Sequence, residues 1–438
     1  MKRNRVRDSL RVSYWDGLFN SAMVGLVSDY VTPFALWLKA TTSQIGLLSA
    51  FSSLASSLLQ LVAADITDWA RSRKRIVVLF VYLQLLVFLP GIIIPFVFKE
   101  HAVLALIVCN TLFNGFAALA TPAWSSLMSE YVPTGKRGKY FGWRAKVMGP
   151  VAMAFSFISG IILFLFKGNG LAAFAIIFSS AFLCRLASWY FLARMYEPGI
   201  SVRKEDTFSF IRFLVKMRES NFARFTVFVA LFQFSVNVAA PFFPVLMLRD
   251  LKFNYLTYTI LIAAVTCANI FTIGRWGKFA DRVGNLRIMR FTAFFIASLP
   301  ILWIINRHPV FLFIAQLVSG FAWAGFNLCA SNFIYDAVSA PKRTRCIAYF
   351  NVLAGIATFC GAVLGGYIVN FLPALFGYRL LSLFLIAGIL RFCVAGLLFG
   401  KIKEVRSTEH ISSRELFYSV VGLNPIIGAR QDMRKERE

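Results

Sequence analysis

The chain has 438 residues, of which 58% are hydrophobic and only 15% are charged, whereas soluble chains carry about 25% charged residues. This composition excludes an ordinary water-soluble globular protein, because much of the surface must face something other than water. The formal net charge of +26 would suit a nucleic-acid partner, but the basic residues stand in short clusters between long apolar stretches. That spacing is typical of loops between membrane spans, so we expect a lipid bilayer and no nucleic acid as a partner.

Apolar stretches of about 20 residues, the length that crosses a bilayer as a helix, recur along the chain. A more polar stretch separates six of them from six others. The predicted spans are 14–38, 43–65, 76–98, 102–129, 147–166, 170–195, 223–248, 256–276, 287–306, 309–334, 346–372 and 378–400. Because lipid offers backbone groups no hydrogen-bond partner, each span is predicted to be an α-helix.

Polar segments divide these spans into parts. We expect an N-terminal six-helix bundle over 1–196, a cytoplasmic interfacial linker over 197–222, a C-terminal six-helix bundle over 223–400 and a cytoplasmic tail over 401–438. The linker mixes Phe with basic residues, which predicts an amphipathic helix on the membrane surface. Most Lys and Arg fall on the side that holds both termini, which places the termini in the cytoplasm. We expect a monomer in the plasma (inner) membrane.

The two sets of six spans match one another as an internal repeat. Each match is weak alone, but the matches share two constant offsets in residue number. The pairs are Asn20 with Gln233 and Asp68 with Asp281 at one offset, and Asn110 with Gln316, Glu130 with Asp336 and Arg185 with Arg391 at the other. Two parallel six-helix halves are the architecture of one large transporter fold.

A loop motif between the eighth and ninth spans points to the same fold. It runs Gly277-Lys-Phe-Ala-Asp281-Arg282-Val-Gly284 and is followed by Arg287. This segment resembles the loop signature of the major facilitator superfamily. The resemblance implies an all-α integral membrane protein with twelve transmembrane helices in two six-helix pseudo-symmetric bundles, the MFS fold.

In the first half the same motif is degraded. Ala64 replaces its glycine, Asp68 is kept, and Trp69 stands where the family has Arg. A basic-Gly segment that begins at Arg137 also resembles one that follows helix 4 in the family. The resemblance implies that this loop helps to latch the outward-facing state. The departure leaves open whether the first half has such a latch.

Charges at the ends of the spans are candidates for gating, because ion pairs there can form in one state and break in the other. A solvated loop face is the alternative interpretation. The candidate gating residues are Asp68, Glu130, Arg137, Gly277, Asp281, Arg282, Gly284, Asp336 and Arg343.

The resemblance implies a substrate cavity lined by helices 1, 4, 7 and 10. Amides on these helices can bind many ligands and Trp can stack on rings, although each can also join helices. The candidate cavity residues are Asn20, Asp29, Asn110, Asn114, Trp124, Gln233, Asn237, Gln316, Trp323 and Asn327.

Ionisable residues inside spans carry a functional hypothesis by default. Asp29 in the first span is the candidate coupling residue for protons, with a hydrated or paired carboxylate as the alternative. Asp16 is expected to be a solvated acid near the cytoplasmic end. Arg185 and Arg391 are buried charges that could bind an anionic substrate, but the peripheral place of helices 6 and 12 in the family favours a structural role.

The sequence therefore predicts a secondary active transporter of a small solute, working by alternating access and coupled to protons. A facilitator without coupling, an exchanger, a lipid or lysolipid translocase of the same fold and a non-transporting membrane sensor stay open. An enzyme is not expected, because no nucleotide-binding Gly-rich loop, metal-ligand cluster or nucleophile constellation is apparent. For the same reason we expect no cofactor and no metal.

Overall fold

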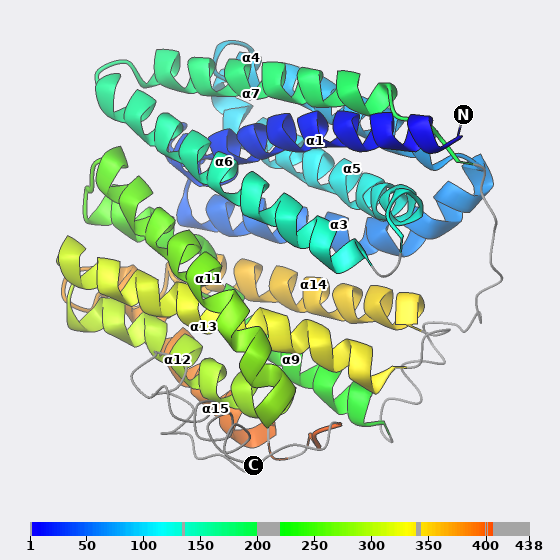
Figure 1. The fold of residues 1–438 in the computed structure, drawn as a ribbon. Helices are drawn as coiled ribbons and strands as arrows, with labels where there is room; N and C mark the ends of the chain where they lie inside the picture. The colour runs from blue at the N-terminus through cyan, green and yellow to red at the C-terminus, as the bar shows by residue number, and fades with distance from the viewer. Residues whose placement is uncertain are drawn as a thin grey trace, which may run out of the picture. The chain divides into compact units, whose positions relative to one another are not determined.

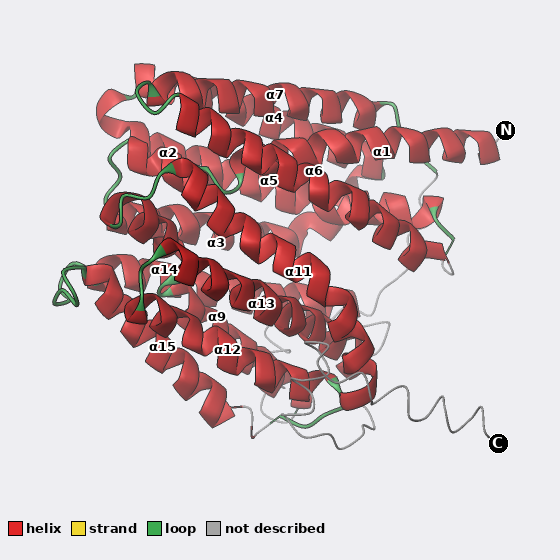
Figure 2. Ribbon diagram, turned by 60° about the vertical axis from the view of Figure 1, so that its left-hand side comes forward, coloured by secondary structure: helices red, strands yellow, loops and turns green. Residues whose placement is uncertain are grey.

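The computed structural model describes residues 2–133, 136–198, 220–338, 343–398, 400 and 402–405. Within these residues the regular structure is helical and no strand is present (Figure 2). The all-α expectation is therefore confirmed. Most of the predicted interfacial linker, 197–222, and most of the predicted tail, 401–438, lie outside the described residues.

The first half of the chain forms one helix for each predicted span, and the first span is broken into two pieces. The helices are α1 Lys2–Val27, α2 Val31–Trp37, α3 Thr42–Ala70, α4 Arg73–Val97, η1 Lys99–His101, α5 Ala102–Tyr131, α6 Arg137–Leu165 and α7 Gly170–Ala193. Polar caps fix where some of them begin: Thr41 and Gln44 form a capping box at α3, and the Ser72 hydroxyl accepts a hydrogen bond from the Arg75 N–H at α4.

The second half repeats this order, and its first span is again irregular. The helices are α9 Asn221–Asn237, η4 Ala240–Phe242, α10 Phe243–Val245, η5 Leu246–Asp250, α11 Tyr255–Val283, α12 Asn285–Ile305, α13 Pro309–Ala337, α14 Arg343–Ile368 and α15 Arg379–Leu398. Pro241 and Pro244 lie in the irregular stretch, where a proline lacks the N–H that a continuous helix needs. Short 3₁₀ and π turns replace the α-helix there.

Two helices begin at least a full helical turn earlier than the hydropathy pattern predicts. The first helix starts at Lys2 instead of residue 14, and α6 starts at Arg137 instead of residue 147. A hydropathy ruler counts only the apolar part, whereas a helix can continue past the hydrocarbon with charged residues. In the described residues ten helices are long and apolar enough to cross a membrane, and α1 and α4 are not among the ten.

The structure divides into two compact units that cut across α9, α11, α14 and α15. The first unit comprises Met1–Asp206, Val229–Ile262 and Ala348–Phe384, and the second comprises Thr207–Phe228, Ala263–Ile347 and Leu385–Glu438. In the first unit α1 packs against α6 and α7, and α5 packs against α3 and α4 (Figure 1). In the second unit α12 packs against α13 (Figure 1).

Small residues mark the closest helix contacts of the first unit. A Cβ added to Gly25 of α1 would lie 2.1 Å from the Ala152 carbonyl oxygen of α6. A Cβ added to Gly355 of α14 would lie 1.7 Å from the Ser57 hydroxyl of α3. Lipid gives helices no hydrophobic drive to associate, so close backbone approach at such residues supplies the packing that joins them.

The α3–α14 contact runs along most of both helices. The Ser43 hydroxyl donates to the Gly366 carbonyl oxygen over 2.7 Å near one end of this contact. Near the other end, the Asn351 amide donates to the Gln60 side-chain oxygen over 2.8 Å. We call this contact the α3–α14 seam; it joins a helix of the first half to a helix of the second half inside the first unit.

We predict that Gly25→Leu destabilises the protein by about 1–3 kcal/mol, because the added atoms collide with the α6 backbone, which has no flexible end that could move aside. Thermal melting of the purified protein in detergent measures the effect. Gly142→Leu is the matched control, since no atom lies within 4 Å of a Cβ added to Gly142 of α6. Equal melting temperatures for the two variants would contradict the packing argument.

Candidate functional site

A network of buried polar side chains crosses the interior of the first-half helices, with Arg185 of α7 at its centre. Arg185 is 6% exposed. Its guanidinium donates to the Asn20 side-chain oxygen of α1 over 2.6 Å and to the Gln84 side-chain oxygen of α4. It also donates to the Ser188 hydroxyl over 3.3 Å. These bonds tie three helices together through neutral side chains.

The only acid in this network is Asp16 of α1. The expected solvated position of Asp16 is wrong, because the residue is 4% exposed. One carboxylate oxygen accepts a hydrogen bond from the Ser188 hydroxyl over 2.7 Å. The other oxygen lies 3.7 Å from the Arg144 guanidinium of α6, which is an ion pair without a direct hydrogen bond.

Arg144 completes what we call the arginine network, made of Asp16, Asn20, Gln84, Arg144, Arg185 and Ser188. Its guanidinium donates to the Ser13 carbonyl oxygen over 2.6 Å and lies 5.0 Å from the ring centroid of Trp124. The network thus holds two cations and one anion, so its net charge is positive. The Arg185 Nε is buried and has no hydrogen-bond partner within the described part of the chain.

The second half has a buried arginine at the equivalent place. Arg391 of α15 is 2% exposed and donates to the Ile296 carbonyl oxygen of α12 over 3.0 Å. Arg185 reaches side chains of two other helices, whereas this contact of Arg391 is to the backbone. The repeat therefore keeps a buried arginine in both halves.

A second polar group lies at the break between α1 and α2, and Asp29 is part of it. The Asp29 carboxylate is half-buried and accepts a hydrogen bond from the Ser156 hydroxyl of α6 over 3.1 Å. Its backbone carbonyl accepts from the Tyr258 hydroxyl of α11 over 2.6 Å. Asp29 therefore contacts both a first-half helix and a second-half helix within the first unit.

Tyr30 makes the matching contacts from the other side of the break. Its hydroxyl donates to the Ser156 carbonyl oxygen over 2.6 Å and lies 2.7 Å from the Thr259 hydroxyl of α11. A Cβ added to Gly160 of α6 would lie 2.1 Å from the same Thr259 hydroxyl. We call Asp29, Tyr30, Ser156, Tyr258 and Thr259 the Asp29 cluster.

The predicted cavity residues are spread over several contacts. Asn20 and Trp124 belong to, or lie against, the arginine network. The Asn110 amide donates to the Ser52 hydroxyl of α3 over 2.6 Å, and the Asn114 amide donates to the Asn110 carbonyl oxygen over 2.7 Å. These two amides serve contacts within and between helices, which is the alternative role that the sequence left open.

Cavity candidates of the second half divide between α9 and α13. The Asn237 amide donates to the Gln233 carbonyl oxygen over 2.8 Å and to the Thr358 hydroxyl over 3.3 Å. On α13, Gln316 and Trp323 are half-buried and Asn327 is exposed. Gln233 and Asn237 belong to the first compact unit, and Gln316, Trp323 and Asn327 belong to the second.

Two of the predicted gating acids contact the start of a neighbouring helix. Glu130 at the end of α5 forms an ion pair with Arg73 at the start of α4. Asp336 at the end of α13 accepts a hydrogen bond from the Asn285 amide at the start of α12 over 2.8 Å. The same contact thus occurs in both halves. The partner of the acid is a charged arginine in the first half and a neutral asparagine in the second.

The remaining gating candidates take other positions. Arg137 donates to the Val132 carbonyl oxygen over 3.1 Å, beyond the end of α5. Gly284 has φ +89°, a conformation that glycine adopts without strain, and it precedes α12. The exposed candidates are Asp68, Asp281 and Arg282, Gly277 is half-buried, and the Arg343 side chain lies outside the described residues.

The sequence did not point to two further acids, which bind equivalent helix starts in the two halves. The Glu197 carboxylate accepts from the Lys74 N–H over 3.1 Å and from the Ser72 hydroxyl over 2.6 Å, at the start of α4. The Glu404 carboxylate accepts from the Leu286 N–H over 2.7 Å, at the start of α12. Each acid follows the last span of its half, so it stabilises the positive end of that half's third helix.

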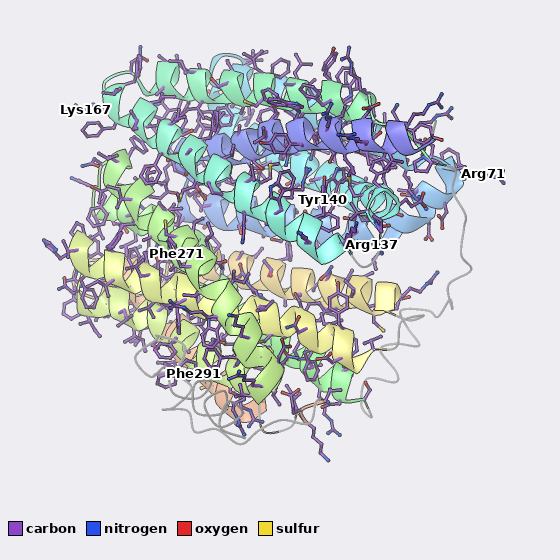
Figure 3. All side chains as sticks on the ribbon, viewed as in Figure 1. Arg71, Arg137, Tyr140, Lys167, Phe271 and Phe291 are labelled. Carbon is purple, nitrogen blue, oxygen red and sulfur yellow. The ribbon has the colours of Figure 1, made fainter. Side chains whose placement is uncertain are left out.

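Basic side chains mark one end of the first-half helices. Arg71 and Arg137 lie at the end that also holds the N-terminus, and Lys167 lies at the opposite end of α6 (Figure 3). The described residues hold no group of three His, Cys, Asp or Glu side chains placed to bind a metal ion.

The charge balance of the arginine network predicts unequal effects of two isosteric changes. Asp16→Asn leaves two buried cations without an anion and should destabilise the protein by about 3–5 kcal/mol. Arg144→Gln leaves one cation and one anion and should cost less. Adding Arg144→Gln to Asp16→Asn should restore part of the loss, because it removes one of two repelling charges.

Melting temperatures of the wild type, both single variants and the double variant measure this cycle. Additive losses in the double variant would show that the two side chains do not share an electrostatic interaction. A melting temperature of Asp16→Asn equal to that of the wild type would show that the charge of Asp16 is not required.

Comparisons with known proteins agree with this architecture. The family model described as Major Facilitator Superfamily matches residues 225–437. The multi-drug resistance efflux pump PmrA of Streptococcus pneumoniae is 21% identical over 383 residues, covering 85% of this chain and 91% of the pump. The expected family resemblance is confirmed.

Solved structures of transporters are similar in fold. The nucleoside transporter NupG is 13% identical with a TM-score of 0.66, covering 90% of this chain and 99% of that chain. A bacterial homologue of the iron transporter ferroportin, in an inward-facing state, is 13% identical with a TM-score of 0.65, covering 89% and 98%. At such identities the likeness shows the fold and not the solute.

Proposed function

We propose that this chain belongs to the Major Facilitator Superfamily and is a secondary active transporter that moves a small solute by alternating access and couples that movement to protons. The observation that carries the proposal is the Asp29 cluster. It contains a half-buried carboxylate at a helix break, and it contacts helices of both halves of the repeat. A carboxylate at such a contact can link its own protonation to the opening of the contact.

The Asp29 cluster and the α3–α14 seam are the moving parts of the proposed cycle. Both join first-half helices to second-half helices, and the cluster lies near the start of α11. For the solute to enter from the end where α11 begins, the contacts of the Asp29 cluster and of the seam must separate. Contacts made of single hydrogen bonds and glycine faces can separate and form again without unfolding a helix.

Asp29 is the proposed proton carrier of this cycle. When ionised, its carboxylate accepts the Ser156 hydroxyl hydrogen bond that links the α1–α2 break to α6. When protonated, it carries no charge and can donate a hydrogen bond itself, which removes the electrostatic reason for that contact. A proton would thereby favour one of two arrangements of the cluster.

Each half is proposed to move as one body around these contacts. The Glu130–Arg73 ion pair and the Glu197 cap connect the start of α4 to the ends of α5 and α7. Asp336 and Glu404 make the corresponding contacts at α12. We place the chain in the plasma membrane with both termini in the cytoplasm, which the excess of basic residues on that side supports.

Drug-like organic compounds are the first solutes to test, because the curated relative is described as a multi-drug resistance efflux pump. The purified protein can be screened for thermal stabilisation by such compounds, by nucleosides and by lipids. Stabilisation by a soluble compound would support solute transport, and movement of a labelled lipid between the leaflets of proteoliposomes would contradict it in favour of a lipid translocase.

Asp29→Asn is predicted to abolish accumulation driven by a pH gradient while leaving exchange of solute across the membrane. The amide keeps the size of the carboxylate but cannot take up the proton. Uptake into proteoliposomes, with and without a pH gradient, measures both activities. The control is Asp65→Asn, an exposed acid on α3. Gradient-driven uptake by Asp29→Asn at the wild-type rate would remove Asp29 from the coupling role.

A cross-link across the α3–α14 seam is predicted to stop transport reversibly. A Cβ added to Gly366 would lie 3.2 Å from the Ser43 Cα, so cysteines at these two positions are close enough to form a disulfide. Oxidation should reduce transport by more than tenfold and a reducing agent should restore it, because the disulfide holds the seam closed. Unchanged transport after complete cross-linking would contradict the opening of this seam.

The matched control is a cysteine pair inside one half. A Cβ added to Gly115 of α5 would lie 3.9 Å from the Ala55 Cβ of α3, a separation that a disulfide spans, and both helices belong to the first half. A cross-link between these positions joins helices that are proposed to move together, so it should leave transport within about twofold of the uncross-linked protein.

A further inference from the structure

A pocket lies where the start of α4 meets the end of α7. Its volume is about 320 Å³, and it is lined by Lys74, Arg75, Val78, Ala193 and Glu197. This is the end of the first unit at which Arg71 and the N-terminus also lie (Figure 3). The arginine network and the Asp29 cluster contribute no residue to this pocket.

The residues that line the pocket carry a net positive charge. Both carboxylate oxygens of Glu197 already accept hydrogen bonds from the first turn of α4, one from the Lys74 N–H and one from the Ser72 hydroxyl. The Glu197 carboxylate is thus hydrogen-bonded to the start of α4. The lining also contains the cationic residues Lys74 and Arg75. Arg194, which lies 4.2 Å over the Tyr190 ring, adds a third cation on an exposed neighbouring side chain.

Farther from these charged residues, α4 and α7 carry less polar side chains on the same helix faces. Four residues after Val78 on α4 comes Tyr82, and four residues before Ala193 on α7 comes Trp189. The Trp189 indole N–H donates to the Val78 carbonyl oxygen over 3.2 Å, and the Tyr82 and Trp189 rings lie 5.7 Å apart. Past these rings, α4 and α7 expose Leu86 and Leu186.

This order of side chains is the order of chemical groups in one leaflet of a membrane. Basic side chains lie at the level of phosphate groups, Trp and Tyr lie at the polar–apolar boundary, and aliphatic side chains face acyl chains. Basic pockets between transmembrane helices bind the head groups of anionic lipids. The pocket fits a molecule that has a phosphate at one end and hydrocarbon at the other.

We propose that the α4–α7 pocket binds an anionic phospholipid such as phosphatidylglycerol. Its phosphate lies against Lys74 and Arg75, and its acyl chains run over Val78, Ala193 and Trp189. The lipid would brace the helix start at which Glu130 and Glu197 also act. This proposal concerns a site on the outside of the first-half bundle and does not depend on what solute the protein carries.

The second half lacks the same pocket chemistry. Since Glu404 binds the Leu286 N–H as Glu197 binds the Lys74 N–H, Leu286 stands where the first half has Lys74. By the same register Arg290 stands where the first half has Val78. Arg287 stands where the first half has Arg75, so a basic side chain is kept there, but the apolar side chain that Val78 supplies is not repeated at α12.

Native mass spectrometry of the full chain in detergent tests the site. Dioleoyl phosphatidylglycerol is compared with dioleoyl phosphatidylcholine, which has the same acyl chains but no net charge. We expect one phosphatidylglycerol to be retained in preference to phosphatidylcholine. Soluble glycerol 1-phosphate is a third arm, and we expect it to bind too weakly to be retained because it has no acyl chain.

Variants separate this pocket from general attraction to a basic surface. Lys74→Gln with Arg75→Gln should weaken phosphatidylglycerol binding about 25-fold, at about fivefold for each charge removed. Arg71→Gln removes a charge from the same loop but from a residue that does not line the pocket, so it should change binding by less than twofold. Ala193→Trp should also abolish retention, because the ring fills the space without changing the charge.

Three outcomes would overturn the proposal. One is equal retention of the two lipids by the wild type. Another is a loss in Arg71→Gln as large as that in the Lys74 and Arg75 double variant. The third is retention of glycerol 1-phosphate as strong as that of the lipid, which would assign the pocket to a soluble phosphate.

Discussion

Hydrocarbon offers no hydrogen-bond partners, and this constraint governs both the helices and the polar groups between them. A buried arginine must find its acceptors inside the protein. Arg185 finds them on α1 and α4 through Asn20 and Gln84, which fixes the position of α7 against two other helices. The same constraint explains why the break at Ser28–Tyr30 is tolerated, since Ser156, Tyr258 and Thr259 supply partners there.

Because lipid does not drive helices together, the contacts between them depend on close approach and not on the burial of large apolar side chains. Gly25 against Ala152 and Gly355 against Ser57 bring backbones within a distance that a side chain would prevent. The first contact lies within one half of the repeat, and the second lies between the halves. The second contact belongs to the α3–α14 seam, whose Ser43 and Asn351 hydrogen bonds can be replaced by bonds to water if the seam separates.

The sequence was sufficient for the features that depend on local composition. Helices occur at all the predicted spans, although the break between α1 and α2 inside the first span was not predicted. Interactions between distant segments were not predictable in the same way. Two apolar spans separate Arg73 from Glu130 in the sequence, and only the folded bundle shows that these two side chains form an ion pair.

The errors have a common physical origin. A ruler that begins the fifth span at residue 147 leaves Arg144 in a loop, whereas α6 begins at Arg137 and carries Arg144 into the interior beside Asp16. Asp16 was expected to be solvated because it lies close to the cytoplasmic end of its span. Sequence position gives the depth of a charge in the membrane, but its solvation depends on which helices face it.

The repeat also shows how the two halves differ in their chemistry. Both halves keep an acid at the start of the third helix and an acid at the end of the fourth, so both keep the contacts that hold a bundle together. Between residues 223 and 400, however, the only acids are Asp250, Asp281 and Asp336, and each lies in or next to a helix end. The first half alone places acids in the interior of its spans, at Asp16 and at the Asp29 break. In the proposed cycle, the carboxylate that takes up a proton therefore lies in the first half, and the contacts of Tyr258 and Thr259 with the Asp29 cluster would carry the response to the second half.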